Sequence, residues 1–185
     1  ISGQAYFFED FTPGSIIDSK GVQYDPVAMN YNGYTHSFEV RQEDRFISLD
    51  PAFYQSVLFP VNAGKDTITF VKGVHPAFRN TFVQEVYRSE QLILVKQFIV
   101  GLTENQKNIP GGILEVKRFS PRNEWYLVKT SSKTRLKLDN NKRQLLKVLG
   151  QEKVLGSYLK QHKEINLNTD AGMKMLIKEW ERLAF

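Results

Sequence analysis

The chain contains no cysteine among its 185 residues. This absence excludes disulfide frameworks, thiolate zinc sites and cysteine nucleophiles together. It does not fix the cellular compartment, because a chain without cysteine suits an oxidising space as well as a reducing one.

Long hydrophobic runs are missing as well. No window of the sequence approaches the roughly 18 apolar residues that a membrane-spanning helix needs. We therefore expect a protein that is soluble, or that lies at a membrane without crossing it. With 41% hydrophobic and 12% aromatic residues, the chain can bury one substantial core, and one main domain is expected.

Patterns typical of catalytic or ligand sites are also lacking. The three histidines, at positions 36, 75 and 162, have no second histidine at metal-ligand spacing. Neighbouring residues of a strand point to opposite faces, which argues against His36 and Ser37 as a catalytic pair. Gly111-Gly112 lacks the Lys-Ser/Thr of a phosphate-binding loop. The sequence thus predicts no catalytic residue, no metal site and no cofactor.

Up to about residue 138 the sequence consists of short segments rich in β-branched and aromatic residues, separated by turn residues. In "MNYNGYTHSFEVR", residues 29–41, Asn32-Gly33 lies between two alternating runs, which predicts a hairpin with a type I′ turn. Other strands are expected at 6–8, 15–17, 45–49, 54–59, 67–71, 82–87, 92–100, 113–119, 125–130 and 134–138, and residues 103–112 should form a long surface turn. The fold class is therefore mainly β (α+β), an antiparallel meander curled into a barrel, half-barrel or sandwich.

Helical patterns begin after residue 138. Asp139-Asn140-Asn141 offers an N-cap, the leucines of 145–149 share one face, and Gly150 can end the helix. A second helix would carry residues 154–159, and a third, capped near Asn168 or Thr169, would carry residues 173–183. Such short helices are marginal alone. We therefore expect residues 1–138 to form an antiparallel β-domain and residues 139–185 a helical tail packed on it, as a single structural unit.

The formal charge of +5 is unevenly distributed. Residues 1–132 hold thirteen Lys/Arg against fourteen Asp/Glu, whereas residues 133–185 hold twelve against six. The candidate binding residues of this basic region are Lys133, Arg135, Lys137, Lys142, Arg143 and Lys147. A basic patch can meet an acidic protein, an anionic membrane or nucleic acid, but no RNA-binding motif accompanies this one. The alternative is a solvated lysine-rich surface.

Two tyrosines, Tyr31 and Tyr34, flank the predicted turn and are the second candidate binding feature. Exposed tyrosines on a hairpin are common in recognition surfaces. The alternative is cross-strand packing, which aromatic pairs also favour. The sequence favours packing over recognition.

The order of these features resembles a loosely defined group of exported cell-envelope proteins of Bacteroidota. The resemblance rests on "FFEDFTPGSIIDSKGVQYDPVAMNYNGYTHSFEVRQEDRFISLD" and on "EWYLVKTSSKTRLKLDNNKRQLLKVLGQEKVLGSYLKQHKEINLNTDAGMKMLIKEW". It implies a signal peptide removed before the present start and residence in the periplasm or outer envelope. It implies no catalytic residue, and its matched positions Asn30, Tyr31, Asn32 and Tyr34 are hairpin determinants.

Three hypotheses about function follow. The first is a non-enzymatic envelope binding or scaffold protein that engages a protein partner or the membrane surface through its basic C-terminal region. The second is a lipocalin-like carrier, in which a closed barrel encloses a small apolar ligand. The third is an envelope hydrolase that uses acidic residues such as Asp44, Asp50 or Glu85.

Overall fold

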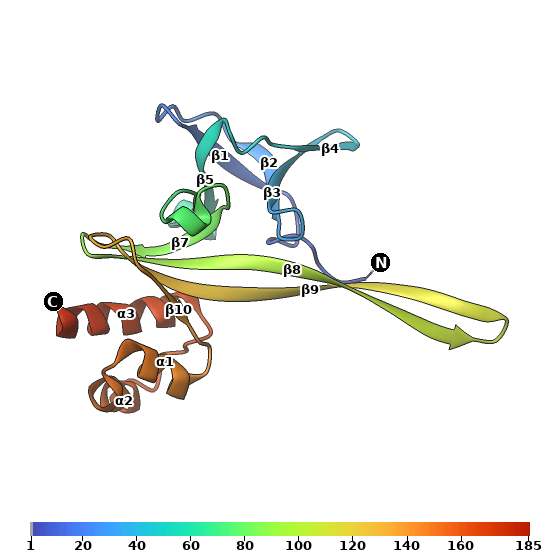
Figure 1. The fold of residues 1–185 in the computed structure, drawn as a ribbon. Helices are drawn as coiled ribbons and strands as arrows, with labels where there is room; N and C mark the ends of the chain where they lie inside the picture. Colours follow the sequence, from blue (N-terminus) through green and yellow to red (C-terminus); the bar gives the residue numbers. More distant parts are fainter. Residues whose placement is uncertain (1) are drawn as a thin grey trace. The chain divides into compact units, whose positions relative to one another are not determined.

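The structure is a computed structural model that describes residues 2–185, apart from the side chains of Lys107 and Ile109. Ten strands form one mainly antiparallel sheet in the order β10-β9-β8-β7-β6-β5-β1-β2-β3-β4, and three helices follow (Figure 1). The strands are β1 Thr12–Asp18, β2 Val27–Asn32, β3 Ser37–Gln42, β4 Arg45–Ser48, β5 Tyr54–Val61, β6 Asp66–Val71, β7 Val83–Arg88, β8 Leu92–Ile109, β9 Gly112–Lys129 and β10 Arg135–Leu138. The predicted fold class is confirmed, and the sheet is open, with β10 and β4 at its edges.

The three helices are α1 Lys142–Leu149, α2 Glu152–Gln161 and α3 Asp170–Ala184, and two 3-10 turns, η1 Asn62–Gly64 and η2 Pro76–Phe78, lie among the strands. The predicted caps are confirmed. Asn141 accepts hydrogen bonds from two backbone amides of α1, Gly150 closes α1 with a φ of 74°, and Thr169 caps α3. None of the helices in residues 2–185 has both the length and the apolar content that crossing a bilayer requires.

The chain divides into two compact units. Unit 1 consists of the chain up to Gln84 together with Gln97–Asn123, and unit 2 consists of Glu85–Lys96 and Glu124–Phe185. These bounds differ from the expected division into residues 1–138 and 139–185. The difference arises because β7, β8 and β9 each contribute residues to both units.

The first predicted hairpin forms, but its turn differs from the prediction. β2 pairs with β3 so that Tyr31 lies opposite Phe38 and Asn32 opposite Ser37, which leaves a four-residue connection from Gly33 to His36. The prediction of a two-residue type I′ turn is therefore wrong. The Asn32 side chain instead accepts hydrogen bonds from the amides of Tyr34 and Thr35, at 3.0 and 3.2 Å, an Asx-type turn that a short sequence pattern does not distinguish from type I′.

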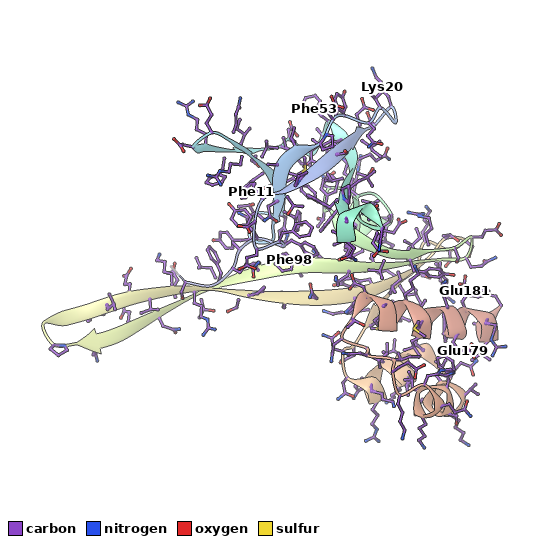
Figure 2. The ribbon with its side chains drawn as sticks, turned by 180° about the vertical axis from the view of Figure 1, so that it is seen from behind. Phe11, Lys20, Phe53, Phe98, Glu179 and Glu181 are labelled. Carbon is purple, nitrogen blue, oxygen red and sulfur yellow. The ribbon has the colours of Figure 1, made fainter. Side chains whose placement is uncertain are left out.

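The segment expected as a long surface turn, residues 103–112, is strand for most of its length. β8 and β9 are each 18 residues long and are joined by Pro110-Gly111 alone. We call residues 101–120 the distal ribbon, and Figures 1 and 2 show its end extending beyond the other elements of unit 1. Its polar composition suggested a loop, but two paired strands with solvent on both faces need no apolar face.

Aromatic rings fill the core of unit 1. Five of them, Tyr31, Phe38, Phe59, Phe70 and Phe82, are fully buried. The ring of Phe38 lies 5.0 Å from that of Tyr31 and 5.3 Å from those of Phe70 and Phe82, centroid to centroid, a spacing typical of edge-to-face packing. The space that a small apolar ligand would need inside this sheet is therefore occupied by side chains.

Unit 2 has an aliphatic core built on the helices. Leu145, Leu155, Leu176 and Ile177 are fully buried and pack with Leu92 and other apolar residues of β8, β9 and β10. Polar contacts fix the position of α3 within this unit. The Trp180 indole donates to the carbonyl of Leu149 at 2.8 Å. Glu181, which is labelled in Figure 2, accepts hydrogen bonds from Tyr87, at 2.8 Å, and from Ser89. Lys96 pairs with Asp170, at 2.5 Å, at the start of α3.

Candidate functional site

The predicted basic residues all lie in unit 2, in two groups. Arg135 and Lys137 lie on β10, Lys133 lies in the turn before it, and Lys142, Arg143 and Lys147 lie on α1. All six are exposed. We call the second group the α1 basic face.

The β10 group is held against the strand beside it. The Arg135 guanidinium lies 4.7 Å from the centre of the buried Tyr126 ring, and the Lys137 ammonium lies 5.8 Å from it. Lys137 also pairs with Glu124 at 3.0 Å, and Glu124 accepts a hydrogen bond of 2.6 Å from the Tyr126 hydroxyl. Arg135 and Lys137 thus share one face of β10, and Leu138 is buried on the other side. These two cations therefore stabilise the sheet, and Lys137 has an acidic partner.

The α1 basic face differs because its charges have no such partner. Leu145, Leu146 and Leu149 bury the opposite side of the helix, so that Lys142, Arg143 and Lys147 project outward. Within residues 2–185, no carboxylate is found at ion-pair distance from any of the three cations. They are available to a partner of opposite charge.

Two of these cations, Lys142 and Arg143, occupy positions that are unfavourable for the helix itself. Lys142 and Arg143 occupy the first turn of α1, which has no acidic residue, although the positive end of the helix dipole favours anions there. Arg143 and Lys147 form a like-charge pair at i,i+4, which also destabilises a helix. Lys147, in contrast, lies in the last turn, where the dipole favours a cation. The two first-turn cations therefore do not stabilise α1, and binding of a partner would explain their presence.

Two surface features accompany the α1 basic face. A hollow of about 390 Å³ is lined by Arg143, Gln144, Lys147 and Glu152. Two valines are also exposed, Val148 of α1 by 39% and Val154 of α2 by 47%. Cationic side chains beside a hollow and single apolar residues form a surface that can accept a protein carrying carboxylates.

The two predicted tyrosines lie in different environments. Tyr31 is fully buried, where burial raises the pKa of its hydroxyl, and that hydroxyl lies 3.4 Å from both the His36 ring and the Phe82 carbonyl oxygen. Tyr31 is thus part of the core and presents nothing to a partner. Tyr34 is 47% exposed and its ring lies 5.4 Å from that of Phe119, so only Tyr34 contributes to the surface of unit 1.

The three histidines each make a local contact. His36 lies near the Tyr31 hydroxyl, and burial lowers its pKa. His75 accepts from the amide of Ala77 at 3.0 Å, and His162 lies 3.0 Å from Glu164. In the part of the chain that the structure describes, no cluster of three or more metal-ligating side chains occurs.

The three acidic residues of the hydrolase hypothesis also have separate surroundings. Asp50 accepts a hydrogen bond from the amide of Ala52 at 2.8 Å, and Glu85 pairs with Arg88 at 2.5 Å. Asp44 is exposed in the turn between β3 and β4. Asp44 and Asp50 belong to unit 1 and Glu85 to unit 2, and the structure gives no acid/base pair among them.

Two surfaces of unit 1 were missed by the sequence reasoning. One is a groove of about 450 Å³ between residues 3–9 and Phe119. The other is the outer edge of β9 in the distal ribbon. A strand over 113–119 was predicted there, and what was missed is that residues 103–109 continue the strand beside it; Pro110-Gly111 is the turn signal that could have shown this hairpin.

Comparisons with known proteins add no assignment. A scan against protein-family models finds no match, and searches of curated proteins and of solved structures find no significant match. The resemblance to exported Bacteroidota proteins therefore stays a prediction, and the function is argued from the site alone.

Proposed function

We propose that the chain is a non-enzymatic binding or scaffold protein that engages an acidic protein surface through the α1 basic face. One observation carries the proposal: Lys142, Arg143 and Lys147 are exposed without a carboxylate at ion-pair distance in the described residues, and two of them, Lys142 and Arg143, lie in the first turn, where the helix dipole disfavours positive charge. Charges that cost stability in the free protein can be retained because they steer and orient a partner.

An anionic membrane surface is the second candidate partner. The exposed Val148 and Val154 favour it, because apolar side chains beside lysines can enter the headgroup region. Interfacial helices, however, usually carry several large apolar residues on the exposed face, whereas Leu145, Leu146 and Leu149 of α1 are buried in unit 2. The acidic protein is therefore the preferred partner.

The two other hypotheses receive less support. The carrier hypothesis expected a closed barrel around a ligand, but the sheet is open and aromatic rings fill the core of unit 1. The hydrolase hypothesis expected acidic residues gathered in a barrel mouth, whereas Asp44, Asp50 and Glu85 have separate surroundings. Residence in the periplasm or envelope rests on the resemblance alone and is part of the proposal.

The test is charge reversal of the α1 basic face. The triple variant Lys142→Glu, Arg143→Glu, Lys147→Glu is compared with a control, Lys20→Glu, Lys65→Glu, Arg79→Glu, which changes the net charge equally at exposed positions of unit 1. Polyglutamate and vesicles containing phosphatidylglycerol are the two probes. We expect the α1 variant to bind polyglutamate about tenfold more weakly or worse, and the control to bind as the wild-type chain does.

The outcomes separate the candidates. If both triple variants lost polyglutamate binding equally, only net charge would matter, and this result would contradict the proposal. Binding to vesicles but not to polyglutamate would replace the acidic protein with the membrane. Native mass spectrometry of the chain purified from an envelope extract would then give the mass of the natural complex.

A further inference from the structure

The outer edge of β9 in the distal ribbon is largely open. β10 pairs with β9 only at Trp125–Val128. Among the described residues, Ser2 is the one backbone partner on this edge from Gly112 to Phe119; its amide donates to the Lys117 carbonyl at 2.9 Å and its carbonyl accepts from the Phe119 amide at 2.8 Å. Within the part of the chain that the structure describes, no strand lies beside Gly112 to Val116 on that side.

The direction of the free backbone groups follows from the Ser2 contact. Because Lys117 and Phe119 bond to Ser2, their backbone groups point away from β8. Backbone direction alternates along a strand, so the amide and carbonyl groups of Ile113 and Glu115 point the same way. Four alternate residues therefore present one row of donors and acceptors.

The side chains along this edge are unusual for a strand left in water. Ile113 is 63% exposed and Leu114 is 47% exposed. Natural proteins commonly protect such edges with short strands, charges or a covering element, because an open edge pairs with other chains. An isolated two-stranded ribbon is also marginally stable in water. The edge does carry Glu115 and Lys117, but the exposed Ile113 and Leu114 and the marginal stability of a two-stranded ribbon favour an additional strand that pairs these charges.

We propose that this edge pairs antiparallel with the same edge of a second copy of the chain, about a two-fold axis at Val116. In that register the residues of one face, Ile113, Glu115, Lys117 and Phe119, are self-complementary, while on the other face Leu114 lies opposite Arg118 of the second copy. Glu115 lies opposite Lys117 of the second copy, Lys117 opposite its Glu115, and Ile113 opposite its Phe119. Opposite charges and apolar pairs directly across two strands stabilise a sheet, and a two-fold axis makes each pair occur twice.

The ribbon already holds one of these charges in place. Lys117 pairs with Glu104 of β8 at 2.8 Å, so its ammonium lies on the face that the pairing uses. In the dimer, Lys117 lies between Glu104 of its own chain and Glu115 of the second copy. The two ribbons then form a continuous four-stranded sheet.

Ser2 competes with this pairing. It occupies the Lys117 carbonyl and the Phe119 amide, which the register assigns to Glu115 and Ile113 of the second copy. Dimer formation replaces the two hydrogen bonds of Ser2 in each chain with a longer ladder. Removing Ser2 together with the residue before it is therefore expected to strengthen the dimer.

Disulfide trapping tests the register, because the chain has no cysteine of its own. Val116 faces its own copy as a non-hydrogen-bonded pair, whose Cα atoms lie about 4.5 Å apart, within reach of a disulfide. Under mild oxidation, Val116→Cys should form a covalent dimer of twice 21.4 kDa. The control Leu114→Cys should stay monomeric, since its Cα atom lies about four residues, or roughly 13 Å, from that of its copy. Trapping at 114 and not at 116 would overturn the proposal.

Charge exchange tests the pairing without a covalent bond. By sedimentation equilibrium we expect Glu115→Lys alone, and Lys117→Glu alone, to self-associate roughly tenfold more weakly than the wild-type chain. An equimolar mixture of the two variants should restore the dimer, because every cross-strand pair is again of opposite charge. A wild-type chain that stays monomeric, or a mixture that does not recover, would overturn the proposal. The α1 triple variant should dimerise normally, which separates this proposal from the function proposed above.

Discussion

Unit 1 and unit 2 solve the same packing problem with different side chains. Unit 1 has strands and short 3-10 turns, and large rings such as Phe38 and Phe70 fill its core. Unit 2 places leucines such as Leu145 and Leu155 on the buried faces of helices. The difference teaches that a dense aromatic segment, here residues 29–41, can serve a core that no helix covers, and does not by itself indicate recognition.

Charge separates the units further. Unit 1 holds ten Lys/Arg against eleven Asp/Glu, and unit 2 holds fifteen against nine. Within unit 2, Arg135 and Lys137 of β10 are engaged with Tyr126 or Glu124, whereas in the described residues no carboxylate lies at ion-pair distance from the three cations of the α1 basic face. The excess positive charge of the protein is thus concentrated in unit 2.

The largest expected effect is that of removing a ring from unit 1. Phe38→Ala should destabilise unit 1 by about 3–5 kcal/mol, because it leaves a cavity among buried rings. Both tryptophans, Trp125 and Trp180, belong to unit 2, so tryptophan fluorescence reports on unit 2 alone. In urea unfolding of the variant, we expect the circular dichroism transition to occur at a clearly lower urea concentration than the fluorescence transition.

The matched control lies in the other unit. Leu155→Ala should shift the fluorescence transition, by about 2–5 kcal/mol in free energy of unfolding. Transitions that coincide for both probes in both variants would show that the two units unfold as one.

A smaller effect is expected at Tyr6 of unit 1. Its hydroxyl donates to Glu39 at 2.6 Å. Burial, followed by the hydrogen bond to this carboxylate and its charge, raises the Tyr6 pKa from 10.0 to about 12. Tyr6→Phe should cost about 1–2 kcal/mol below pH 10.

The pH dependence of this cost has a definite sign. The raised pKa stabilises the fold fully below pH 10, and this contribution disappears as the pH rises through 12. Urea unfolding of the wild-type and Tyr6→Phe chains across this range should therefore show a shrinking difference. A constant difference would mean that the Tyr6 pKa is not raised in the folded protein.

The smallest effect has the opposite sign. Arg143→Glu should stabilise unit 2 by about 0.3–1 kcal/mol, because it places a negative charge at the positive end of the α1 dipole and removes the like-charge pair with Lys147. Tryptophan fluorescence in urea measures the free energy of unfolding of unit 2. The control Lys65→Glu, in unit 1, should leave this free energy unchanged. A destabilised Arg143→Glu chain would mean that Arg143 has a structural role after all.

The sequence was a good guide where structure is local. The Asn141 cap, the leucine face of α1 and Gly150 lie within one short segment, and capping chemistry and helical periodicity predict them directly. The strands of unit 1 were likewise found from β-branched and aromatic runs. The mainly β fold class could be predicted for this reason.

It was a poor guide where the outcome depends on distant residues. The turn after Asn32 has four residues because the partner strand begins at Ser37, and the approach of β8 is close enough that a Cβ on Gly33 would lie 2.6 Å from the Phe98 ring. The basic residues were predicted as one patch. Only the fold shows that Glu124 engages Lys137, while among the residues that the structure describes no carboxylate lies at ion-pair distance from Arg143. Neither distinction is encoded in local spacing.

The interleaving of the two units constrains the order in which the chain can fold as it is synthesised. Unit 1 cannot complete its core until Phe98, Val100 and Phe119 have emerged, long after its first strands. In unit 2, Leu92 and Leu94 cannot complete their packing until α3, the last element, has been made. Such contacts between residues far apart in sequence slow folding and expose apolar surface for longer. During synthesis the chain would therefore expose apolar residues of unit 1 until Phe119 has emerged, and those of unit 2 until α3 has been made.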